Sequence, residues 1–308
     1  MDDELQLSII VTTYNVAPYV RQCLGSAVRQ RLPAGSFEVV AIDDHSTDGT
    51  LDVIEECARL ADNIRVVPLP VNTPGGFGFS ANLGVKVSRG KYVGFIDGDD
   101  YASLTMFPKL MASAAEVDAD VALCGFNTLN VKAKKVSPWR DDGLLRSMSG
   151  ERFGKLDLTM QKIFYLHLSP VPWRKLYKKS FLQENNITVP VGDFFYEDAP
   201  FHWACTILAN RLTCIKDRLV THRIYRSGQT MSVHPEKRIK DFLINFKIIY
   251  KFLKKQKCYD TYEDAFFDFV WDYVHSVKKN FEVDDAAIIN DIFTKEEAER
   301  YWNHINEK

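Results

Sequence analysis

The segment FIDGDD at residues 95–100 places three aspartates within four positions, directly after a hydrophobic run. Carboxylates this close repel each other, so Asp97, Asp99 and Asp100 stay ionised together only if water, backbone donors or a cation offsets the repulsion. Mg²⁺ and Mn²⁺ prefer oxygen ligands and commonly bind one or two carboxylates together with substrate phosphates. Gly98 lets the chain turn so that its two neighbouring aspartates can face one site. The segment is a candidate metal site, and a polar turn after a strand is the alternative.

Two further polar clusters are candidates for binding a nucleotide. Thr12–Tyr14 ends one apolar run, and Asp43–Asp44 ends another. A carboxylate can accept hydrogen bonds from a nucleobase N–H or a ribose hydroxyl, and the ring of Tyr14 can stack on a base. The alternative is turn chemistry, because DDHSTDGT (43–50) is rich in residues that bond to their own backbone. The two roles are compatible.

Alternating strands and helices position these clusters. Continuous apolar runs predict buried parallel strands, and apolar residues at helical spacing predict helices between them. The expected strands are 7–15, 37–46, 64–70 and 91–97, and the expected helices are 18–30, 47–61 and 79–88. This order predicts an α/β fold with a doubly wound, mostly parallel sheet flanked by helices. Such sheets bind ligands beyond the carboxyl ends of their strands, so the three clusters should share one crevice.

The second part of the chain is less regular, and the topology of residues 127–170 does not follow from the pattern. The remaining expected elements are a helix at 104–117, a strand at 120–126, a helix at 196–208, and extended chain at 212–225 around a turn at Lys216–Asp217. From Pro235 onward the sequence is rich in helical patterns and lysines.

The overall charge and the cysteines narrow the class of protein. With 39 basic and 41 acidic residues the formal charge is −2, which gives no general electrostatic reason to bind nucleic acid. The six cysteines lack the paired short spacing of zinc or redox motifs, which is typical of reduced thiols in a cytoplasmic protein. The start of the chain is acidic where a secretory signal is basic, and the next apolar run is too short to span a bilayer. We expect a cytoplasmic protein, soluble or peripheral at the inner face of the membrane, and leave the oligomeric state open.

Several motifs together resemble the GT-A fold of family 2 glycosyltransferases. The segments IIVTTYN, VAIDDHSTDGT and NTPGGFGFSANLGVKVSRGKYVGFIDGDD are similar to the nucleotide-binding half, over residues 7–100 and in the family's order. The segments VPWRKLYKKSFLQENNI, FFYEDAPFHWACTILA and YRSGQTMS resemble the second half more thinly. The resemblance implies a catalytic domain at 1–234, with a nucleotide-sugar-binding half at 1–115 and an acceptor half at 116–234. A helical C-terminal region at 235–308 follows.

The resemblance implies an inverting, metal-dependent glycosyltransferase that moves a sugar from a UDP-sugar to a saccharide or lipid-linked acceptor during surface polysaccharide synthesis. Departure of the nucleoside diphosphate builds negative charge on the leaving oxygen, and a bound Mn²⁺ or Mg²⁺ stabilises that charge as a Lewis acid. The acceptor hydroxyl must lose its proton as it attacks from the opposite face, which requires one positioned base. A single base without a covalent nucleophile predicts inversion.

The resemblance also assigns roles to residues of the nucleotide-binding half. Thr12, Tyr14 and Asp44 would hold the uracil and ribose, and Asp97 the ribose region. Asp99 and Asp100 would hold the metal on the diphosphate. The chain departs from the family at Ala81, where relatives commonly have an arginine before Asn82, and this departure puts the contact between the Asn82 loop and the donor in doubt.

In the second half, Glu197 and Asp198 resemble the family's Glu-Asp pair, whose second residue is the general base. Asp198 opens an expected helix whose positive end favours the charged carboxylate, so we expect it to be ionised at neutral pH. Without the resemblance, capping of that helix by the two acidic residues would be the favoured interpretation.

Other features of the second half each keep two interpretations. Trp173, with Arg174 and Lys175, is either an acceptor platform that holds sugar and phosphate or a set of ordinary core and surface residues. His222 is either a metal ligand or, more often for such a residue, a structural histidine. The loop 225–232, with Arg226 and Gly228, is a candidate lid over the diphosphate.

The lysine-rich segment 240–257 carries an apolar stripe and has two interpretations as well. A basic amphipathic helix can lie on an anionic membrane, which would make the protein peripheral. It can equally bury its stripe against the catalytic domain, and we favour this packing.

Three rival functions share some of these features. Gly76, Gly78 and Ala81 spell the G-x-G-x-x-A of NAD(P)-dependent oxidoreductases, with Asp97 at the end of the next strand. However, this pattern follows the third strand where the fingerprint follows the first. A nucleotidyltransferase should carry a glycine- and arginine-rich loop after the first strand, where this chain has TTYNVAPYV. A non-catalytic nucleotide-sugar-binding homologue is the rival that is not an enzyme.

Overall fold

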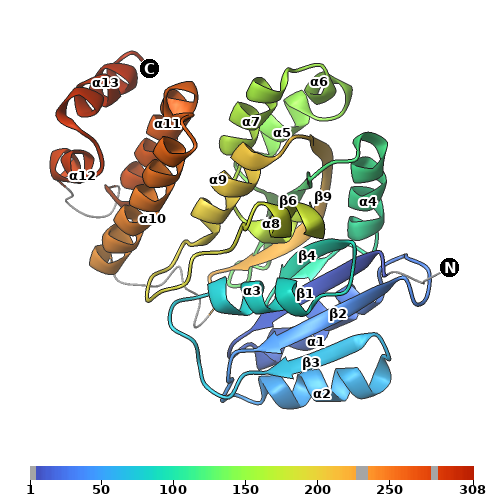
Figure 1. The fold of residues 1–308 in the computed structure, drawn as a ribbon. Coiled ribbons are helices and arrows are strands. Elements are labelled where there is room, and N and C mark those ends of the chain that lie inside the picture. Colours follow the sequence, from blue (N-terminus) through green and yellow to red (C-terminus); the bar gives the residue numbers. More distant parts are fainter. Residues whose placement is uncertain (1–4, 227–234, 279–283) are drawn as a thin grey trace.

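The computed structural model describes residues 5–226, 235–278 and 284–308 (Figure 1). Within these residues one nine-stranded sheet has the order β3-β2-β1-β4-β8-β6-β9-β5, and β7 pairs with β6. The strands are β1 (Leu7–Thr13), β2 (Phe37–Asp43), β3 (Ile64–Pro68), β4 (Tyr92–Asp97), β5 (Tyr101–Ala102), β6 (Val121–Asn130), β7 (Lys135–Pro138), β8 (Lys175–Lys178) and β9 (Leu212–Ile224). Most of the paired residues lie in parallel pairs, which confirms the predicted α/β fold class.

The amino-terminal half is the doubly wound unit that the sequence predicts. Strands β3, β2, β1 and β4 are parallel neighbours, and every residue of β2 is buried, because helices cover the sheet. The helices of this half are α1 (Ala17–Val28), α2 (Thr50–Leu60), α3 (Gly78–Val87) and α4 (Met106–Val117). In the register of the sheet, Thr12 pairs with Ile42 on one side and with Asp97 on the other. The carboxyl ends of these strands therefore lie side by side.

The stretch 127–170, which the sequence pattern left open, contains the end of β6, β7 and the helices α5 (Asp142–Met148), α6 (Glu151–Gly154) and α7 (Leu158–Leu166). A 3₁₀ turn, η1 (Pro172–Arg174), precedes β8, and α8 (Lys179–Glu184) and α9 (Asp198–Leu208) follow it. Strand β8 runs antiparallel to both β4 and β6.

The predicted turn at Lys216–Asp217 is wrong, because β9 is one continuous strand. Its pairing with β6 shifts register around Gly125, which lies opposite Arg218, and this irregularity absorbs the polar residues that suggested a turn. Beyond the shift, β9 also pairs with β5, where Thr221 lies opposite Tyr101. This pairing brings His222 and the residues after it to the aspartates that follow β4.

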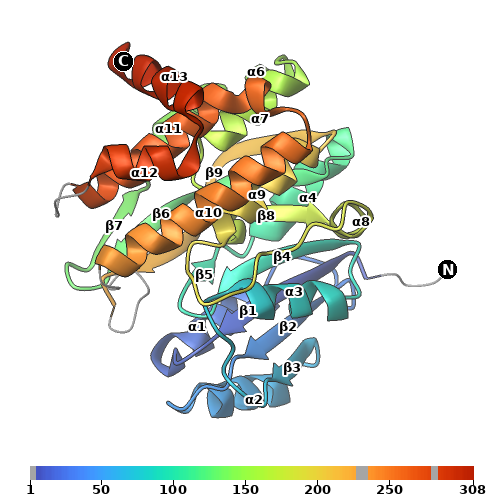
Figure 2. The ribbon, with the colours of Figure 1, turned by 60° about the vertical axis from the view of Figure 1, so that its left-hand side comes forward.

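The C-terminal helices are α10 (Pro235–Lys255), α11 (Tyr259–Lys278), α12 (Asp285–Ile292) and α13 (Lys295–Asn306). They share a hydrophobic core with α9, in which the ring of the fully buried Trp203 meets Phe266 and Phe269 edge-on. Figure 2 shows α10 alongside α9. The apolar stripe of segment 240–257 lies in this core, so the predicted packing of that helix is confirmed.

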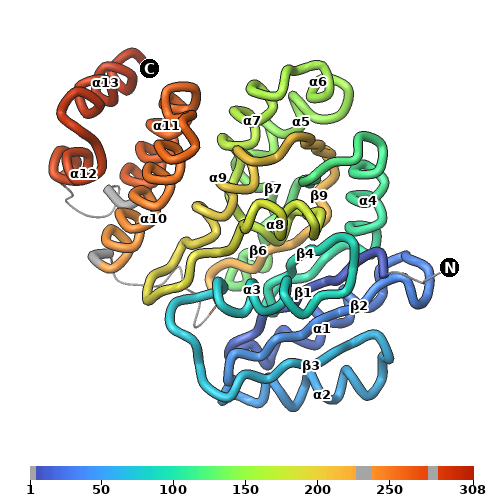
Figure 3. The backbone as a smooth tube through the Cα atoms, in the orientation of Figure 1, coloured from blue at the N-terminus to red at the C-terminus, as the bar shows by residue number. Residues whose placement is uncertain are grey.

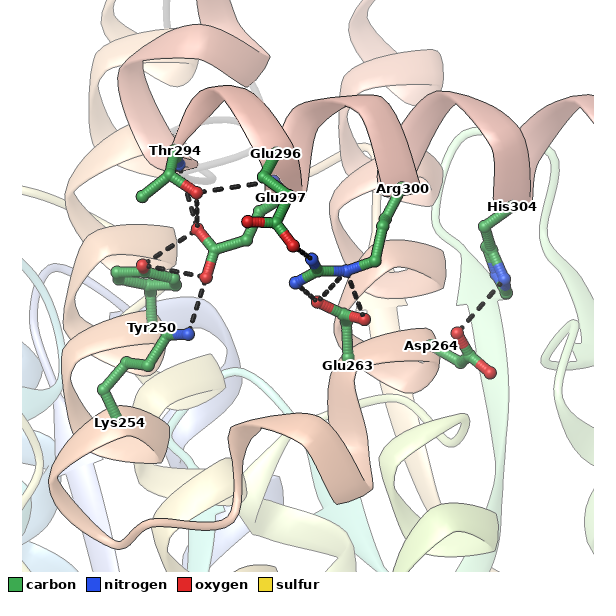
Figure 4. A network of polar contacts seen from close by, with 9 residues as sticks. All are labelled: Tyr250, Lys254, Glu263, Asp264, Thr294, Glu296, Glu297, Arg300 and His304. Carbon is green, nitrogen blue, oxygen red and sulfur yellow. Dashed lines mark hydrogen bonds and ion pairs between the residues drawn. The ribbon is translucent and has the colours of Figure 1, made fainter.

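Polar contacts tie α13 to the two long helices (Figure 4). Glu297 accepts hydrogen bonds from Tyr250 at 3.0 Å and from Lys254 at 2.6 Å, and it closes a capping box with Thr294. Two lysines of α10 are therefore in ion pairs, since Lys247 also meets Asp291 at 2.7 Å. Across the described segments no helix is both long and apolar enough to cross a bilayer.

Candidate active site

The three aspartates after β4 converge as the spacing predicts. Gly98 donates its N–H to the Thr12 carbonyl at 2.9 Å, and a Cβ at this position would lie 2.6 Å from a methyl carbon of Thr13. Only glycine therefore lets the chain turn here. One ligand oxygen from each of Asp97, Asp99 and Asp100 lies within 4.8 Å of the others.

Burial makes this cluster electrostatically costly. Burial and then the charges of Asp100 and Asp99 raise the pKa of Asp97 well above its usual range. Burial likewise raises the pKa of Asp100, although the attraction of His222 opposes the shift. Three oxygen ligands in a place that resists their shared negative charge fit a hard divalent cation.

Cationic side chains from the end of β9 face the cluster. Asp100 accepts hydrogen bonds from His222 Nδ1 at 2.7 Å and from the backbone N–H of Arg223 at 2.8 Å, and Arg226 forms an ion pair with Asp99. Burial alone would lower the pKa of His222, but the nearby carboxylates, chiefly Asp100, raise it to about 9. The carboxylates therefore favour the charged imidazolium of His222, which offsets part of their negative charge, and ligation of a metal would require its ring to release one proton. Its predicted role as a metal ligand stays a prediction.

A cavity of about 410 Å³ joins the aspartates to the predicted catalytic pair. The sequence-predicted residues that line it are Asp97, Asp99, Glu197, Asp198, His222 and Arg226. Segments far apart in the sequence therefore meet in one place. The predicted lid lies outside the described residues from position 227 onward, so only its first part, including Arg226, can be placed.

Three of the predicted nucleoside contacts, Thr12, Tyr14 and Asp44, are not among the residues that line this cavity. Thr12 is next to Asp97 in the sheet, and Tyr14 follows β1 with 49% of its surface exposed. Asp44 is buried and accepts hydrogen bonds from the backbone N–H and the hydroxyl of Thr73, both at 2.9 Å, and from Asn72 at 3.1 Å. Burial raises its pKa in spite of these bonds. Asp44 therefore ties β2 to the segment after β3.

Turn chemistry in DDHSTDGT is present beside this contact. Asp43 accepts a hydrogen bond from the Ser46 N–H at 2.9 Å, and Asp48 accepts one from the Thr50 N–H at 3.0 Å. The turn interpretation therefore holds for Asp43 and Asp48, and binding of the nucleoside by Asp44 stays a prediction.

Asn82 differs from its predicted place at the donor. Its side-chain amide donates to the Val189 carbonyl at 2.7 Å and accepts from the Val189 N–H at 2.9 Å. Both ends of the amide are used to hold the 185–197 segment against α3. Asn82 does not line the cavity, as Thr12, Tyr14 and Asp44 do not, and its predicted contact with the donor stays a prediction.

Asp198 is the first residue of α9 and lies half-buried in the cavity wall. Its Oδ1 has no hydrogen-bond partner among the described residues. Burial raises the pKa of Asp198, and the nearby Lys175 ammonium opposes the shift. Desolvation therefore opposes the effect of the helix terminus, and the ionised state of Asp198 at neutral pH stays a prediction.

Glu197 is the N-cap residue of α9, yet its side chain makes no capping hydrogen bond. Its Oε1 instead accepts the Gly78 N–H at 3.2 Å. Burial raises the pKa of Glu197 to about 7. The capping interpretation of the Glu-Asp pair therefore does not hold for Glu197, whose carboxyl group contacts the glycine-rich loop.

The glycines of the G-x-G-x-x-A pattern serve close packing between two segments. A Cβ on Gly76 would lie 2.8 Å from Glu197 Oε1, and one on Gly78 would lie 2.4 Å from the Pro190 carbonyl oxygen. Gly75 has φ +84°, and a Cβ there would lie 2.2 Å from the Gly192 carbonyl oxygen. Figure 3 shows the cyan 70–78 segment passing beside the yellow 185–197 segment. The pattern is thus accounted for without a dinucleotide.

The basic residues beside Trp173 do not form the phosphate-holding part of an acceptor platform. Arg174 is fully buried and pairs with Asp141 at 2.7 Å, while Lys175 donates to the carbonyls of Pro170 and Val171 at 2.8 and 2.9 Å. Burial and then repulsion by Arg174 lower the pKa of Lys175 to about 7. Trp173 itself lines the cavity and stacks on His222, with 5.1 Å between ring centroids.

Sequence reasoning missed much of the cavity wall. The residues of the cavity wall that the sequence did not indicate are Trp139 and Arg140, from the stretch 127–170, and Arg238, Phe242, Asp272, Tyr273 and Ser276, from the C-terminal helices. No local motif marks them, because only the packing of α10 and α11 on the catalytic unit brings them to the site.

Comparison with solved structures defines the class of fold. The crystal structure of S. aureus TarS 1–349 in complex with UDP-GlcNAc matches with a TM-score of 0.66 and 23% identity, over 97% of this chain and 88% of that one. The mannosyltransferase PcManGT from Pyrobaculum calidifontis, in complex with GDP-Man and Mn²⁺, matches with a TM-score of 0.56 and 15% identity, over 97% and 84%. The chain thus has a GT-A-like α/β fold with a C-terminal helical region.

Comparison with known sequences defines the family. The model of glycosyl transferase family 2 matches residues 8–184, and the chain belongs to this family. A poly(ribitol-phosphate) beta-glucosyltransferase from Bacillus spizizenii is 30% identical over 74% of this chain and 34% of its own length. The poly(ribitol-phosphate) beta-N-acetylglucosaminyltransferase TarS from Staphylococcus aureus is 32% identical over 75% and 38%. The chain spans little more than a third of these two relatives.

Replacing Gly75 with alanine tests the close packing of the glycine loop, and Gly35→Ala is the matched control. Both glycines have positive φ, but a Cβ on Gly35 meets nothing within 4 Å. The control should lose only the left-handed backbone penalty, roughly 1–2 kcal/mol. Gly75→Ala should lose roughly 1–3 kcal/mol more, because the new methyl group overlaps two carbonyl oxygens. Urea unfolding measures both, and equal losses would refute the close contact.

Proposed function

We propose that this chain is an inverting glycosyltransferase that moves a sugar from a UDP-sugar to a hydroxyl group of a cell-surface polymer or its lipid-linked precursor. The observation that carries the proposal is the shared cavity, which puts three clustered carboxylates and a separate half-buried carboxylate on one space. Family membership supports the reaction class, and a related enzyme crystallised with UDP-GlcNAc supports the donor class. The reaction would take place in the cytoplasm or at the inner face of the membrane.

The donor would bind along the carboxyl ends of β1, β2 and β4. Tyr14 would stack on the uracil, and Thr12, Asp44 and Asp97 would contact the nucleoside. Asp99, with Asp100 and His222 as the other predicted ligands, would hold Mn²⁺ or Mg²⁺ against the diphosphate. The bound cation would supply Lewis-acid stabilisation of the charge on the leaving diphosphate. The mannosyltransferase complex with Mn²⁺ is a structural relative that supports this donor set.

Asp198 would be the general base that takes the proton of the acceptor hydroxyl. A base must be ionised and within hydrogen-bond reach of the proton it takes, and the unpartnered Oδ1 of Asp198 is available for such a bond. Lys175 would keep this carboxylate ionised in spite of its burial. Glu197 would hold the glycine-rich loop through the Gly78 N–H. A single base without a second carboxylate acting as nucleophile gives inversion at the anomeric carbon.

Replacing Asp99 with asparagine tests the metal role. The variant should lose at least about tenfold in the affinity for UDP that depends on Mn²⁺, because it loses a charged oxygen ligand. Calorimetric titration of UDP with and without Mn²⁺ measures this affinity. Asp62→Asn, at an exposed position remote from the site, is the control. Undiminished affinity in the Asp99 variant would remove it from the metal site.

Replacing Asp198 with asparagine tests the catalytic base. We expect UDP binding within about twofold of wild type and transfer slower by roughly 10²–10⁴-fold, the usual contribution of a positioned acid or base. Sugar transfer and calorimetry on the same preparation separate the two effects. Unchanged turnover would exclude Asp198 as the base. Slow UDP release from the donor without an acceptor, lost in Asp99→Asn, would argue against a non-catalytic binding homologue.

Replacing Lys175 with methionine tests the electrostatic support of Asp198. Removal of the neighbouring cation should raise the pKa of Asp198, so the acidic limb of the kcat/KM profile should move to higher pH. Lys178→Met on the same strand is the control, because its ammonium pairs with Asp118 instead. An acidic limb that stays in place in the Lys175 variant would show that Lys175 does not act on the base.

A further inference from the structure

The cavity beside Asp198 extends under the C-terminal helices. Its wall there includes Arg140, Arg238 of α10 and Tyr273 of α11. A second cavity of about 260 Å³ adjoins it, and the residues that line both are Arg140, Ser169, Pro170, Asp272 and Tyr273. The two cavities therefore give space for a molecule longer than one sugar, and Arg140 and Tyr273 lie where they meet.

Two arginines in this wall have no carboxylate partner among the described residues. Arg226, which also lines the cavity, pairs with Asp99, whereas no ion pair forms at Arg140 or Arg238 within the described part of the chain. The guanidinium of Arg140 lies 5.7 Å from the centre of the Trp139 ring, and that of Arg238 lies 5.9 Å from the centre of the Phe242 ring. Aromatic faces hold a guanidinium in place without neutralising it, so its charge remains available to a ligand.

Arg238 gives a second, independent indication of a ligand. Its Nε is buried and finds no acceptor among the described residues. Buried N–H groups are nearly always hydrogen-bonded in folded proteins, so this one on a cavity wall is a donor that water or a bound molecule can use, while the guanidinium also interacts with the Tyr196 hydroxyl. Asp272 lines both cavities as an exposed carboxylate. The two other carboxylates of the second cavity are already in ion pairs, Asp141 with Arg174 and Asp268 with Lys308.

Tyr273 relates this wall to the proposed base. Burial and then the charge of Asp198 raise the pKa of Tyr273, and the charge of Arg140 opposes the shift. Both charged groups therefore act on the same phenol. Asp198, Tyr273 and the two arginines line the same cavity, so a molecule whose hydroxyl group reaches Asp198 can extend toward the arginines.

We propose that Arg140 and Arg238 form a subsite for a phosphate group of the acceptor, most simply the phosphodiester of an oligomer that continues into the second cavity. The proposal rests on the proposed function, because it takes Asp198 as the point where the acceptor hydroxyl is bound. The guanidinium fork matches the geometry of phosphate oxygens, and two such forks select a phosphate over a neutral sugar. The relatives named for poly(ribitol-phosphate) substrates are consistent with this acceptor class.

The test uses two matched oligomers in the presence of UDP and Mn²⁺. One is a short ribitol-phosphate oligomer, and the other has the same length with uncharged methylphosphonate links. Arg140→Gln and Arg238→Gln should each weaken binding of the charged oligomer about tenfold, the effect of losing one charge-assisted hydrogen bond. Wild type should bind the uncharged oligomer more weakly than the charged one. The affinity for the uncharged oligomer should be similar for wild type and for both variants. Arg59→Gln, at an exposed position on α2, is the matched control and should bind like wild type.

A second arm identifies the source of the phosphate. If a short-chain prenyl diphosphate sugar binds in place of the oligomer and both glutamine variants lose it, the subsite stands and the phosphate belongs to a lipid-linked acceptor. The proposal is overturned if wild type binds neither probe, or if both variants bind as tightly as wild type. UDP affinity with Mn²⁺, measured on the same samples, separates this outcome from failure of the proposed function. Intact metal-dependent UDP binding without an arginine effect refutes only the subsite.

Discussion

The mutual repulsion of buried carboxylates is the constraint on which the site depends. Asp97 ends β4, whose other residues are buried, Asp99 and Asp100 follow it, and burial raises the pKa of Asp97 and of Asp100. The fold opposes this cost with cations from a distant part of the chain, since the end of β9 brings His222 to Asp100 and Arg226 to Asp99. A bound divalent cation, together with the diphosphate of the donor, would complete this balance of positive and negative charge. The pairing of β9 with β5 places these cationic side chains, and it therefore determines the electrostatics of the site.

At the other end of the cavity, the desolvation of an acidic side chain is again offset by a nearby cation. Asp198 is desolvated like the clustered aspartates, but its compensation is a single buried lysine that also fastens the 170–171 backbone. The C-terminal helices enclose this end, because they share a core with α9, which carries Asp198 at its first position. The helical region therefore belongs to the wall of the site. Its stability and the geometry of the proposed base depend on the same packing.

The sequence predicts the amino-terminal half of the fold well, because buried parallel strands leave continuous apolar runs and the polar residues that end them are easily recognised. It also predicts that the aspartates after β4 meet the Glu197–Asp198 pair, since both carry a recognisable family pattern. It does not predict the direction of the Asp198 pKa shift, which depends on burial in three dimensions. Nor does it place Arg140 or Arg238, which lie in segments without a motif. The pairing of the Asn82 side chain with Val189 is likewise not visible in the sequence, because the two residues are far apart along the chain.

Crystals grown with UDP and Mn²⁺ test the central claim most directly, through the anomalous scattering of manganese. The account predicts one strong manganese peak within coordination distance of the Asp99 carboxylate and of the UDP diphosphate, in the cavity that Asp198 also lines. A structure with UDP bound in which manganese lies elsewhere, or in which Asp99 remains paired with Arg226 and contacts no ion, would contradict it.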